Sequence, residues 1–289
     1  MELRVLNYFL MVAREENITR AASILHVTQP TLSRQLMQLE DELGARLFDR
    51  SSHNIVLTED GMLLRRRAEE IIGLADKTKK ELMHEEECIT GEISIGCAET
   101  KNMSYLSQKI VQFREQYPGV IFDIYTANAD DVKERIENGI LDMGLMIEPV
   151  EISKYHFKKM PYRERWCILM RKDCPLAKKE RIEPKDLTQV PLLITSRKSV
   201  KNELESWFGV YYQQLNIVAT CNLSYINHSI MVENGIGVAL VHEFDNNNEA
   251  LCLRPIEPEL VNASVLVWKK EQRNAAAVRK FIEYIQSSL

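Results

Sequence analysis

The sequence lacks the features that mark membrane, metal-binding and disulfide-linked proteins. No apolar run approaches the roughly 18 residues that a membrane-spanning helix needs, and we expect no membrane contact. The six cysteines include no CxxC pair and have no histidine at metal-ligand spacing. We therefore expect free thiols in a reducing cytoplasm, with no metal and no cofactor.

The sequence also lacks the marks of a secreted receptor or of an enzyme. The opening segment, MELRVLNYFLMVAREEN, has a short apolar patch followed by acids and no small-residue cleavage site, which favours an amphipathic helix over a signal peptide. No GxSxG, P-loop or HExxH motif occurs. The histidines are scattered, at His26, His53, His84, His156, His228 and His242. Both a transport receptor and an enzyme are therefore disfavoured.

An excess of positive charge is missing as well. The formal net charge is −5, which argues against a non-specific nucleic-acid binder. Residues 1–58 contain six arginines, no lysine and seven acids. A single domain of this charge would bind DNA phosphates poorly. DNA binding would therefore need two copies of the domain, with added contacts from hydroxyl, amide and backbone N–H groups.

Residues 1–58 consist of short helical patterns followed by two short extended segments. Apolar residues recur at helical spacing from Leu3 to Ala13, and a second helix, capped by Asn17 or Thr19, runs to about His26. The segments ARLFDR and NIVLTEDG, joined by polar residues, predict a small β-hairpin. Together with the third helix described next, these patterns indicate a winged helix-turn-helix.

A third helix is predicted over residues 28–42. Its core-facing stripe is Leu32, Leu36, Leu39 and Leu43, and Gly44 ends it. Thr28 is a natural N-cap, so Pro30 falls in the first turn, where a missing N–H costs little. The proline therefore starts the helix instead of breaking it. Helical rotation places these residues on the outer side: Pro30, Ser33, Arg34, Met37 and Gln38, with Thr31 at the flank and Gln29 at the start.

Residues 59–87 predict one long helix. Apolar positions follow alternating steps of four and three, which is a heptad seam. The seam consists of Leu64, Ala68, Ile71, Ala75, Thr78 and Leu82. Two interpretations stay open at this point, a dimerising coiled coil and a helix whose apolar face packs on its own domain.

From Gly91 onward, short β-branched runs alternate with helical patterns, which is typical of an α/β domain with parallel strands. Two such sets, joined by two crossings, predict a hinged two-lobed domain over residues 88–289. We place lobe 1 at about residues 91–160 and 268–289, and lobe 2 at about residues 161–267. The strand NASVLVWKK and the final helix are expected to return to lobe 1.

The stretch TRAASILHVTQPTLSRQLMQLEDELGARLFDR, followed by LTEDG, closely resembles the signature of LysR-type transcriptional regulators. The resemblance spans essentially the whole chain. The heptad helix is similar to that family's linker helix, and the two lobes are similar to its effector domain, whose fold is periplasmic-binding-protein-like. The segment ENGIGVALVHE resembles the family's Gly-rich segment, although His242 stands where a proline is usual.

The resemblance implies an α+β multidomain regulator that binds double-stranded DNA as a homodimer or homotetramer, with RNA polymerase as a further candidate partner. Helix 28–42 would enter the major groove, and the wing near Arg50–His53 the adjacent minor groove. The DNA-binding residues that we expect are Thr28, Gln29, Pro30, Thr31, Ser33, Arg34, Arg50 and His53. For Pro30 and Ser33 taken singly, helix initiation and solvent exposure are the competing explanations.

An unknown small-molecule effector is expected between the lobes, where strand carboxyl ends and helix N-termini meet. Four segments match cleft-lining positions of the family, residues 98–102, 126–129, 146–149 and 195–200, and residues 222–228 close one side. The expected effector-binding residues are Thr100, Asn128, Ile147, Ser196, Lys198, Ser199 and Val200. Helix capping is the competing role for the hydroxyl side chains. Glu99 would repel an anion, so it either points away or meets an amine.

Cysteine oxidation is an alternative signal to a bound effector. Cys167 and Cys174 are the closest pair in the sequence. Redox sensors of the resembled family place their reactive pair between the segments that match Ser196 and Cys221, and here that stretch contains no cysteine before Cys221. Inert core thiols are therefore favoured over a redox signal.

Overall fold

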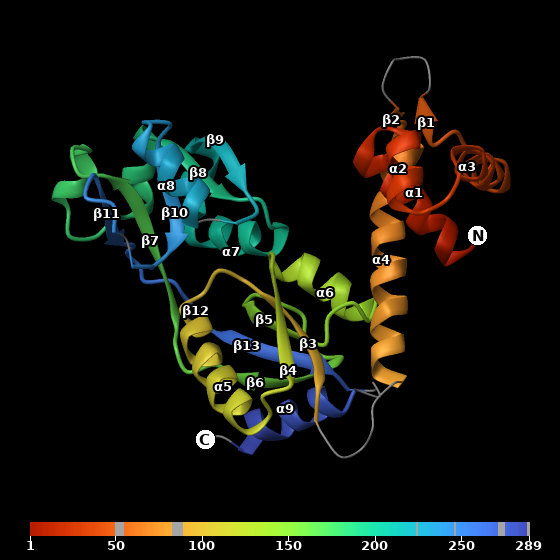
Figure 1. The fold of residues 1–289 in the computed structure, drawn as a ribbon. Coiled ribbons are helices and arrows are strands. Elements are labelled where there is room, and N and C mark those ends of the chain that lie inside the picture. The colour runs from red at the N-terminus through yellow and green to blue at the C-terminus, as the bar shows by residue number, and fades with distance from the viewer. Residues whose placement is uncertain (50–54, 83–88, 224, 246, 271–274, 288–289) are drawn as a thin grey trace. The chain divides into compact units, whose positions relative to one another are not determined.

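The computed structural model describes residues 1–49, 55–82, 89–223, 225–245, 247–270 and 275–287 of the chain. The contacts divide the chain into two compact units, Met1–His84 and Glu85–Leu289. Figure 1 shows a helical N-terminal unit with one hairpin and a C-terminal unit built around two sheets. Among the described residues, no helix is long and apolar enough to cross a membrane.

The N-terminal unit has the helix-turn-helix and hairpin that the sequence predicts. Its elements are α1 (Leu3–Glu15), α2 (Ile18–Ile24), α3 (Gln29–Leu43), β1 (Phe48–Asp49), β2 (Val56–Leu57) and α4 (Glu59–Leu82). The two strands pair antiparallel, with Phe48 opposite Leu57. The second helix ends at Ile24 and not at about His26, because His26 has a left-handed backbone with φ of 53°.

The core of this unit lies where α1, α2 and α3 meet. Phe9, Leu32 and Leu36 are completely buried, and the Phe9 and Phe48 rings lie 5.3 Å apart. The first turn of α4 also closes on this core: a Cβ at Gly61 would lie 2.1 Å from the Leu47 carbonyl oxygen. The glycine of LTEDG is therefore required by this close approach.

Helix α4 carries two apolar stripes. Ala68 is buried and Leu64 is partly buried against the core of the same unit, and α1 packs along this face. A second stripe lies beside this packed face and not opposite it, with Leu63, Ile71 and Leu74 exposed by 50%, 37% and 41%. The predicted seam is thus divided between the two faces, since Leu64 and Ala68 serve the unit's own core and Ile71 does not. Residues 83–88 lie outside the described residues, so the predicted helix end at residue 87 stays a prediction.

The C-terminal unit contains two lobes, each with a five-stranded path of paired strands. In lobe 1 the strand order is β4-β3-β5-β13-β6, with β3 parallel to β4 and β5. The elements of lobe 1 are β3 (Gly91–Cys97), α5 (Asn102–Gln116), β4 (Val120–Thr126), α6 (Ala129–Glu137), β5 (Met143–Ile147), β6 (Tyr155–Lys159), β13 (Ser264–Lys269) and α9 (Ala276–Ser287).

In lobe 2 the strand order is β11-β7-β10-β8-β9, and β12 pairs with β7 outside this path. The elements of lobe 2 are β7 (Glu164–Arg171), η1 (Pro175–Lys178), η2 (Pro184–Gln189), β8 (Pro191–Thr195), α7 (Lys198–Phe208), η3 (Gly209–Gln214), β9 (Asn216–Cys221), α8 (Tyr225–Glu233), β10 (Val238–His242), β11 (Leu251–Pro255) and β12 (Val261–Asn262). Strand β8 lies between β10 and β9 and runs parallel to both. Strand β7 runs antiparallel to β10 and β11.

Each lobe buries apolar residues on both faces of its sheet. In lobe 1, Phe113 and Phe281 cover one face and Val132 lies in the cluster on the other. The chain joins lobe 1 again before residue 268, because β13 already pairs with β5 from Ser264. The sheets are also mixed and not wholly parallel, because the returning strands run against their neighbours.

Candidate functional site

The N-terminal half of α3 presents a polar surface on a helix that is held from behind. The Thr28 hydroxyl accepts the Thr31 N–H at 3.4 Å, and Pro30 occupies the first turn, as the sequence predicts. Leu32, Leu36 and Leu39 are buried. These three leucines fix the rotation of the helix, so the opposite side faces solvent.

Two pairs of polar side chains on this surface bind each other. The Gln29 amide donates a hydrogen bond to the Ser33 hydroxyl at 3.0 Å, and the hydroxyls of Thr28 and Thr31 lie 2.8 Å apart. The bond to Ser33 orients the Gln29 amide and leaves its oxygen and second N–H free to contact another molecule. This is the donor and acceptor pair that glutamine uses on the edge of an adenine.

Charge is distributed unevenly along α3. Arg34 is exposed in the N-terminal half and has no acidic partner among the described residues. In the C-terminal half, Glu40 accepts the N–H groups of Leu47 and Phe48 at 2.8 and 3.3 Å, and Glu42 pairs with the N-terminal amino group. The helix therefore offers a cation and its dipole's positive end at one terminus, and acids at the other.

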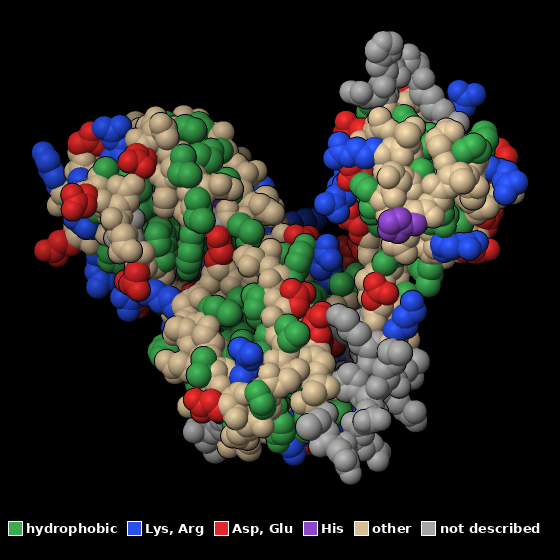
Figure 2. Space-filling view, in the orientation of Figure 1, with side chains coloured by type: hydrophobic (Ala, Val, Ile, Leu, Met, Phe, Trp, Pro, Cys, Tyr) green, Lys and Arg blue, Asp and Glu red, His purple; other side chains and the backbone are tan. Residues whose placement is uncertain are grey.

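The rest of the unit has no dominant basic surface in the view shown. Figure 2 shows basic and acidic side chains interspersed over this unit. Arg20, on α2, is paired with Glu15 at 2.6 Å, so much of its charge is compensated. Arg50 and His53, the predicted wing contacts, lie outside the described residues, and their role stays a prediction.

A pocket lies between the two lobes of the C-terminal unit, with about 550 Å³ of empty space that includes its open mouth. Its lining comes from the carboxyl ends of parallel strands in both lobes and from the helix starts that follow them. The residues are Ala98, Glu99, Asn128, Ala129, Ile147, Glu148, Trp166, Thr195, Arg197, Val200, Asn222, Leu223, Tyr225 and His242. All four segments predicted to line the cleft contribute to it.

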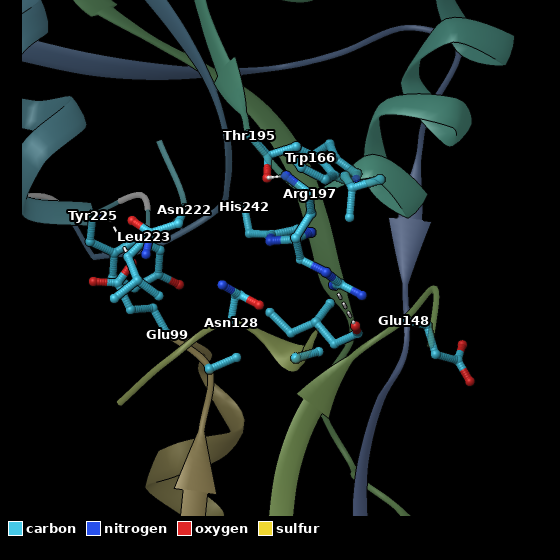
Figure 3. Close-up of a pocket in the computed structure, with 14 residues that line it drawn as sticks. Glu99, Asn128, Glu148, Trp166, Thr195, Arg197, Asn222, Leu223, Tyr225 and His242 are labelled. Carbon is cyan, nitrogen blue, oxygen red and sulfur yellow. Dashed lines mark hydrogen bonds between the residues drawn. The ribbon is translucent and has the colours of Figure 1, made fainter. Parts of the chain in front are cut away.

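Polar bridges join the lobes on one side of the pocket through Arg197. Its guanidinium, on a side chain only 10% exposed, donates to the Pro149 carbonyl at 2.8 Å and to the Ile147 carbonyl at 3.4 Å. It also pairs with the Asp130 carboxylate at 3.4 Å. In Figure 3, Arg197 reaches from the Thr195 side toward lobe 1, whereas the Glu148 side chain points away from the cavity.

The opposite side of the pocket is bridged by residues of the segment after β3. Glu99 accepts the Tyr225 N–H at 3.0 Å, at the first residue of α8. Lys101 pairs with Glu243 at 3.2 Å. Glu99 is thus neither turned away nor unpaired: it lines the pocket and binds the start of a helix in the other lobe.

A buried carboxylate lies where the chain first crosses between the lobes. Glu164, at the start of β7, is 1% exposed and accepts hydrogen bonds from the Thr100 hydroxyl, from the Asn102 amide at 2.9 Å and from the Ser264 hydroxyl at 3.1 Å. Since Ser264 begins β13, this carboxylate joins both crossings to the start of α5.

Comparisons with known proteins agree with both parts of the structure. Residues 3–62 match the family described as "Bacterial regulatory helix-turn-helix protein, lysR family", and residues 88–289 match the "LysR substrate binding domain". The chain belongs to the LysR family. It is a DNA-binding transcriptional regulator with an N-terminal helix-turn-helix and a C-terminal substrate-binding domain, as the sequence predicted, and its relatives are regulators and not enzymes.

Among its relatives, this LysR-family chain is 29% identical to the Hca operon transcriptional activator HcaR of Escherichia coli, over 100% of this chain and 98% of that protein. It is 30% identical to the transcriptional regulator BsdA of Bacillus subtilis, over 83% of each. The crystal structure of CbnR, a LysR family regulator, has a TM-score of 0.73 at 19% identity and covers 99% of this chain and 98% of CbnR. That likeness shows the fold.

The structure places the seven predicted effector residues unequally. Asn128, Ile147 and Val200 line the pocket, whereas the other four are absent from its lining: Thr100, Ser196, Lys198 and Ser199. Thr100 binds Glu164, and the Asn128 side chain caps α6 by accepting the N–H groups of Asp130 and Asp131. Capping, the competing role, therefore explains the geometry of Asn128 even at the pocket wall.

Sequence reasoning missed Trp166 and His242, whose rings lie 4.0 Å apart at the pocket. The Asn262 amide oxygen accepts the Trp166 indole N–H at 2.5 Å and lies 3.3 Å from His242 Nε2. That oxygen can only accept, so His242 carries its proton on Nε2 and presents Nδ1 as an acceptor. Burial lowers the pKa of His242 to about 4, which keeps the ring neutral. His242 stands where a proline is usual in the family, and this difference was the one feature of the sequence that could have pointed to it.

Two of the described thiols, Cys97 and Cys167, are buried in a way that opposes a redox signal. Burial raises the pKa of Cys97 and of Cys167 to about 12, so neither forms the reactive thiolate readily. Cys167 lies inside β7, and Cys174 is half-buried. Within the described part of the chain, no cluster of histidine, cysteine and acidic residues is arranged to hold a metal ion.

Proposed function

We propose that this regulator binds its operator with the N-terminal half of α3 from at least two copies, and that a small molecule in the interlobe pocket controls this binding. The observation that carries the DNA part is the group formed by the exposed Gln29 and Arg34 and the half-buried Ser33, on a helix whose rotation is fixed by buried leucines. Glutamine and arginine are the side chains suited to adenine and guanine edges in the major groove.

The need for a second copy follows from charge. Arg34 is the one cation of α3 itself, so a single copy makes few phosphate contacts. The exposed stripe of α4, with Leu63, Ile71 and Leu74, is the proposed surface for the second copy, because its apolar side chains are not part of the unit's own core cluster. A structure of CbnR is described as a complex with its target DNA, which is consistent with DNA binding by this fold.

Control by a small molecule is supported by the interlobe pocket. A ligand there would touch both lobes next to the bridges made by Arg197 and Glu99. If the ligand binds one arrangement of the lobes better than another, it shifts the population of the arrangements. The same coupling changes DNA affinity only if the two arrangements bind the operator differently.

Thermal unfolding of the full chain in the presence of a metabolite library tests the pocket. A ligand that binds only the folded state raises the melting temperature by mass action. We expect Leu223→Trp, which fills the lining, to remove the shift. Val210→Trp, at a position 80% exposed in the same lobe, is the matched control and keeps it. A ligand whose shift and effect on operator binding persist in Leu223→Trp would contradict the proposed location.

A further inference from the structure

One apolar side chain interrupts the polar outer surface of α3. Met37 is 44% exposed and does not belong to the buried cluster formed by the described residues of its unit. It follows Ser33 by four residues and Arg34 by three, so it lies one helical turn beyond both on the outer side. The unit's own core therefore does not account for a methionine at this position.

The charges on α3 limit which part of the helix can approach DNA. Asp41 is exposed one turn beyond Met37 on the same side, and a carboxylate close to phosphates is unfavourable. The favourable part thus extends from the helix N-terminus, where the dipole is positive, through Arg34 to Met37. Met37 is the last outward apolar side chain before the acidic end of the helix, and the polar Gln38 follows it.

The major groove offers one apolar group on the edges of the unmodified base pairs, the C5-methyl of thymine. A methionine side chain is unbranched, flexible and polarizable, which suits contact with a methyl group whose position varies slightly. We propose that Met37 is a specificity-determining residue, which selects thymine in the half-site at a base next to those contacted by Arg34. Replacement of that thymine by cytosine would remove the methyl and present a polar N–H group to the thioether.

This inference rests on the proposed placement of α3 in the major groove, and one set of titrations examines both. The operator is first obtained by selection from random DNA with the full-length protein. Each thymine of the half-sites is then replaced singly by uracil, which removes only the methyl group. Binding of each duplex is measured by fluorescence anisotropy at one fixed salt concentration, because affinity for DNA depends strongly on salt.

For the wild-type chain we expect one thymine per half-site at which uracil weakens binding about fourfold, the effect of one buried methyl group. In Met37→Ala that penalty disappears, since the side chain that contacts the methyl is gone. Met37→Leu retains most of it. Leu43→Ala, on the same helix and 41% exposed but beyond the acids, keeps the full penalty and is the matched control.

Two results would overturn the proposal: a wild-type chain that is insensitive to uracil at every thymine, or a penalty that is equal in Met37→Ala and wild type. Because Met37 is exposed, the alanine variant should fold, and its melting temperature checks this. Arg34→Ala is titrated in parallel. A strong loss with Arg34→Ala but no uracil effect rejects the role of Met37 alone, whereas unchanged binding by Arg34→Ala rejects the placement of α3.

Discussion

The proposed DNA-binding surface on α3 and the interlobe pocket both collect polar side chains, but they are built differently. The α3 surface comes from the outward residues of one helix, between Gln29 and Met37, and some of its polar side chains bind one another, as Gln29 binds Ser33. The pocket draws its lining from both lobes, and its charged side chains are bound across the gap, as Arg197 is to Asp130. The α3 surface depends only on the fold of the N-terminal unit. The pocket, in contrast, depends on the distance between the two lobes that line it.

This difference assigns separate tasks to the two regions. A surface held by Leu32, Leu36 and Leu39 presents the same groups to every DNA sequence, so selectivity can reside in the side chains themselves. A pocket closed by polar bridges can gain or lose contacts when the lobes move, which is what a signal requires. Substitutions on α3 should therefore change DNA affinity directly, and substitutions at the pocket should change lobe stability and the response to a ligand.

The largest effect is expected from a change outside both surfaces. Ile71→Asp places a carboxylate in the exposed stripe of α4, which we propose as the contact with a second copy. Because low charge makes each α3 weak alone, operator affinity should fall by about 100-fold or more. Fluorescence anisotropy measures the affinity, and light scattering after gel filtration measures the mass.

Glu69→Ala provides the control for this change, since Glu69 lies on the opposite side of α4 and its pair with Arg65 is exposed. It should leave both mass and affinity unchanged. Tight operator binding by Ile71→Asp, or a change in mass without a change in affinity, would show that one α3 suffices. More of the DNA affinity would then come from residues outside α3.

The next largest effect concerns the α3 surface itself. Arg34→Ala should weaken operator binding about 10- to 100-fold, because a good arginine contact with guanine contributes about 1–3 kcal/mol of discrimination. It should also reduce the preference for the selected operator over random DNA. Arg4→Ala removes an exposed cation of the same unit, paired with Glu2 at 3.4 Å, and should change affinity less than threefold. Equal losses for both variants would mean that Arg34 contributes only general charge.

The sequence predicted the α3 surface well because the relevant information is local. Thr28 as N-cap, Pro30 in the first turn and the leucine stripe fix where the helix begins and which side faces out, and each can be read within one helix. The second helix was predicted two residues too long, because nothing local distinguishes His26 with a positive φ from a helical histidine.

The pocket could be predicted only as a set of segments. The sequence places the ends of β3, β4, β5 and β8 at one edge of each sheet, and residues from all four line the cavity. Which side chains face inward depends on partners distant in the sequence: Thr100 turns to Glu164, and Trp166 is positioned by Asn262. Hydroxyl side chains near helix starts are common caps, so their presence did not distinguish a ligand contact from a structural one.

A smaller effect is expected from breaking one bridge of the pocket. Arg197→Ala removes charge-assisted hydrogen bonds to lobe 1. We expect it to lower the free energy of unfolding of the C-terminal unit by about 1–2 kcal/mol. This value is small because solvent screens the exposed Asp130. All three tryptophans lie in residues 85–289, so urea unfolding of the full chain followed by tryptophan fluorescence reports this unit. The neighbouring Lys198→Ala, at an exposed position, should have no measurable effect. Equal stability of the two variants would mean that the Arg197 bridge does not hold the lobes.

The smallest effect concerns pH and again separates the two regions. His228, in α8, is 0% exposed, and neither of its ring nitrogens has a hydrogen-bond partner among the residues that the structure describes. Burial lowers its pKa from 6.5 to about 4. Between these two values the unfolded chain binds more protons than the folded chain, so stability rises with pH across this window and is unaffected by His228 above it. From pH 7 to pH 5 the free energy of unfolding, followed by tryptophan fluorescence, should fall by about 1–2 kcal/mol more in the wild type than in His228→Leu.

The pKa of His242 is lowered to about 4 as well, so His242 also makes the protein less stable as the pH falls. His228→Leu therefore keeps part of the dependence of the free energy of unfolding on pH. His156→Leu, at an exposed position on β6, is the control and should keep all of it. If the free energy of unfolding changed equally with pH in the wild type and in His228→Leu, the buried ring would take up its proton without a cost in stability.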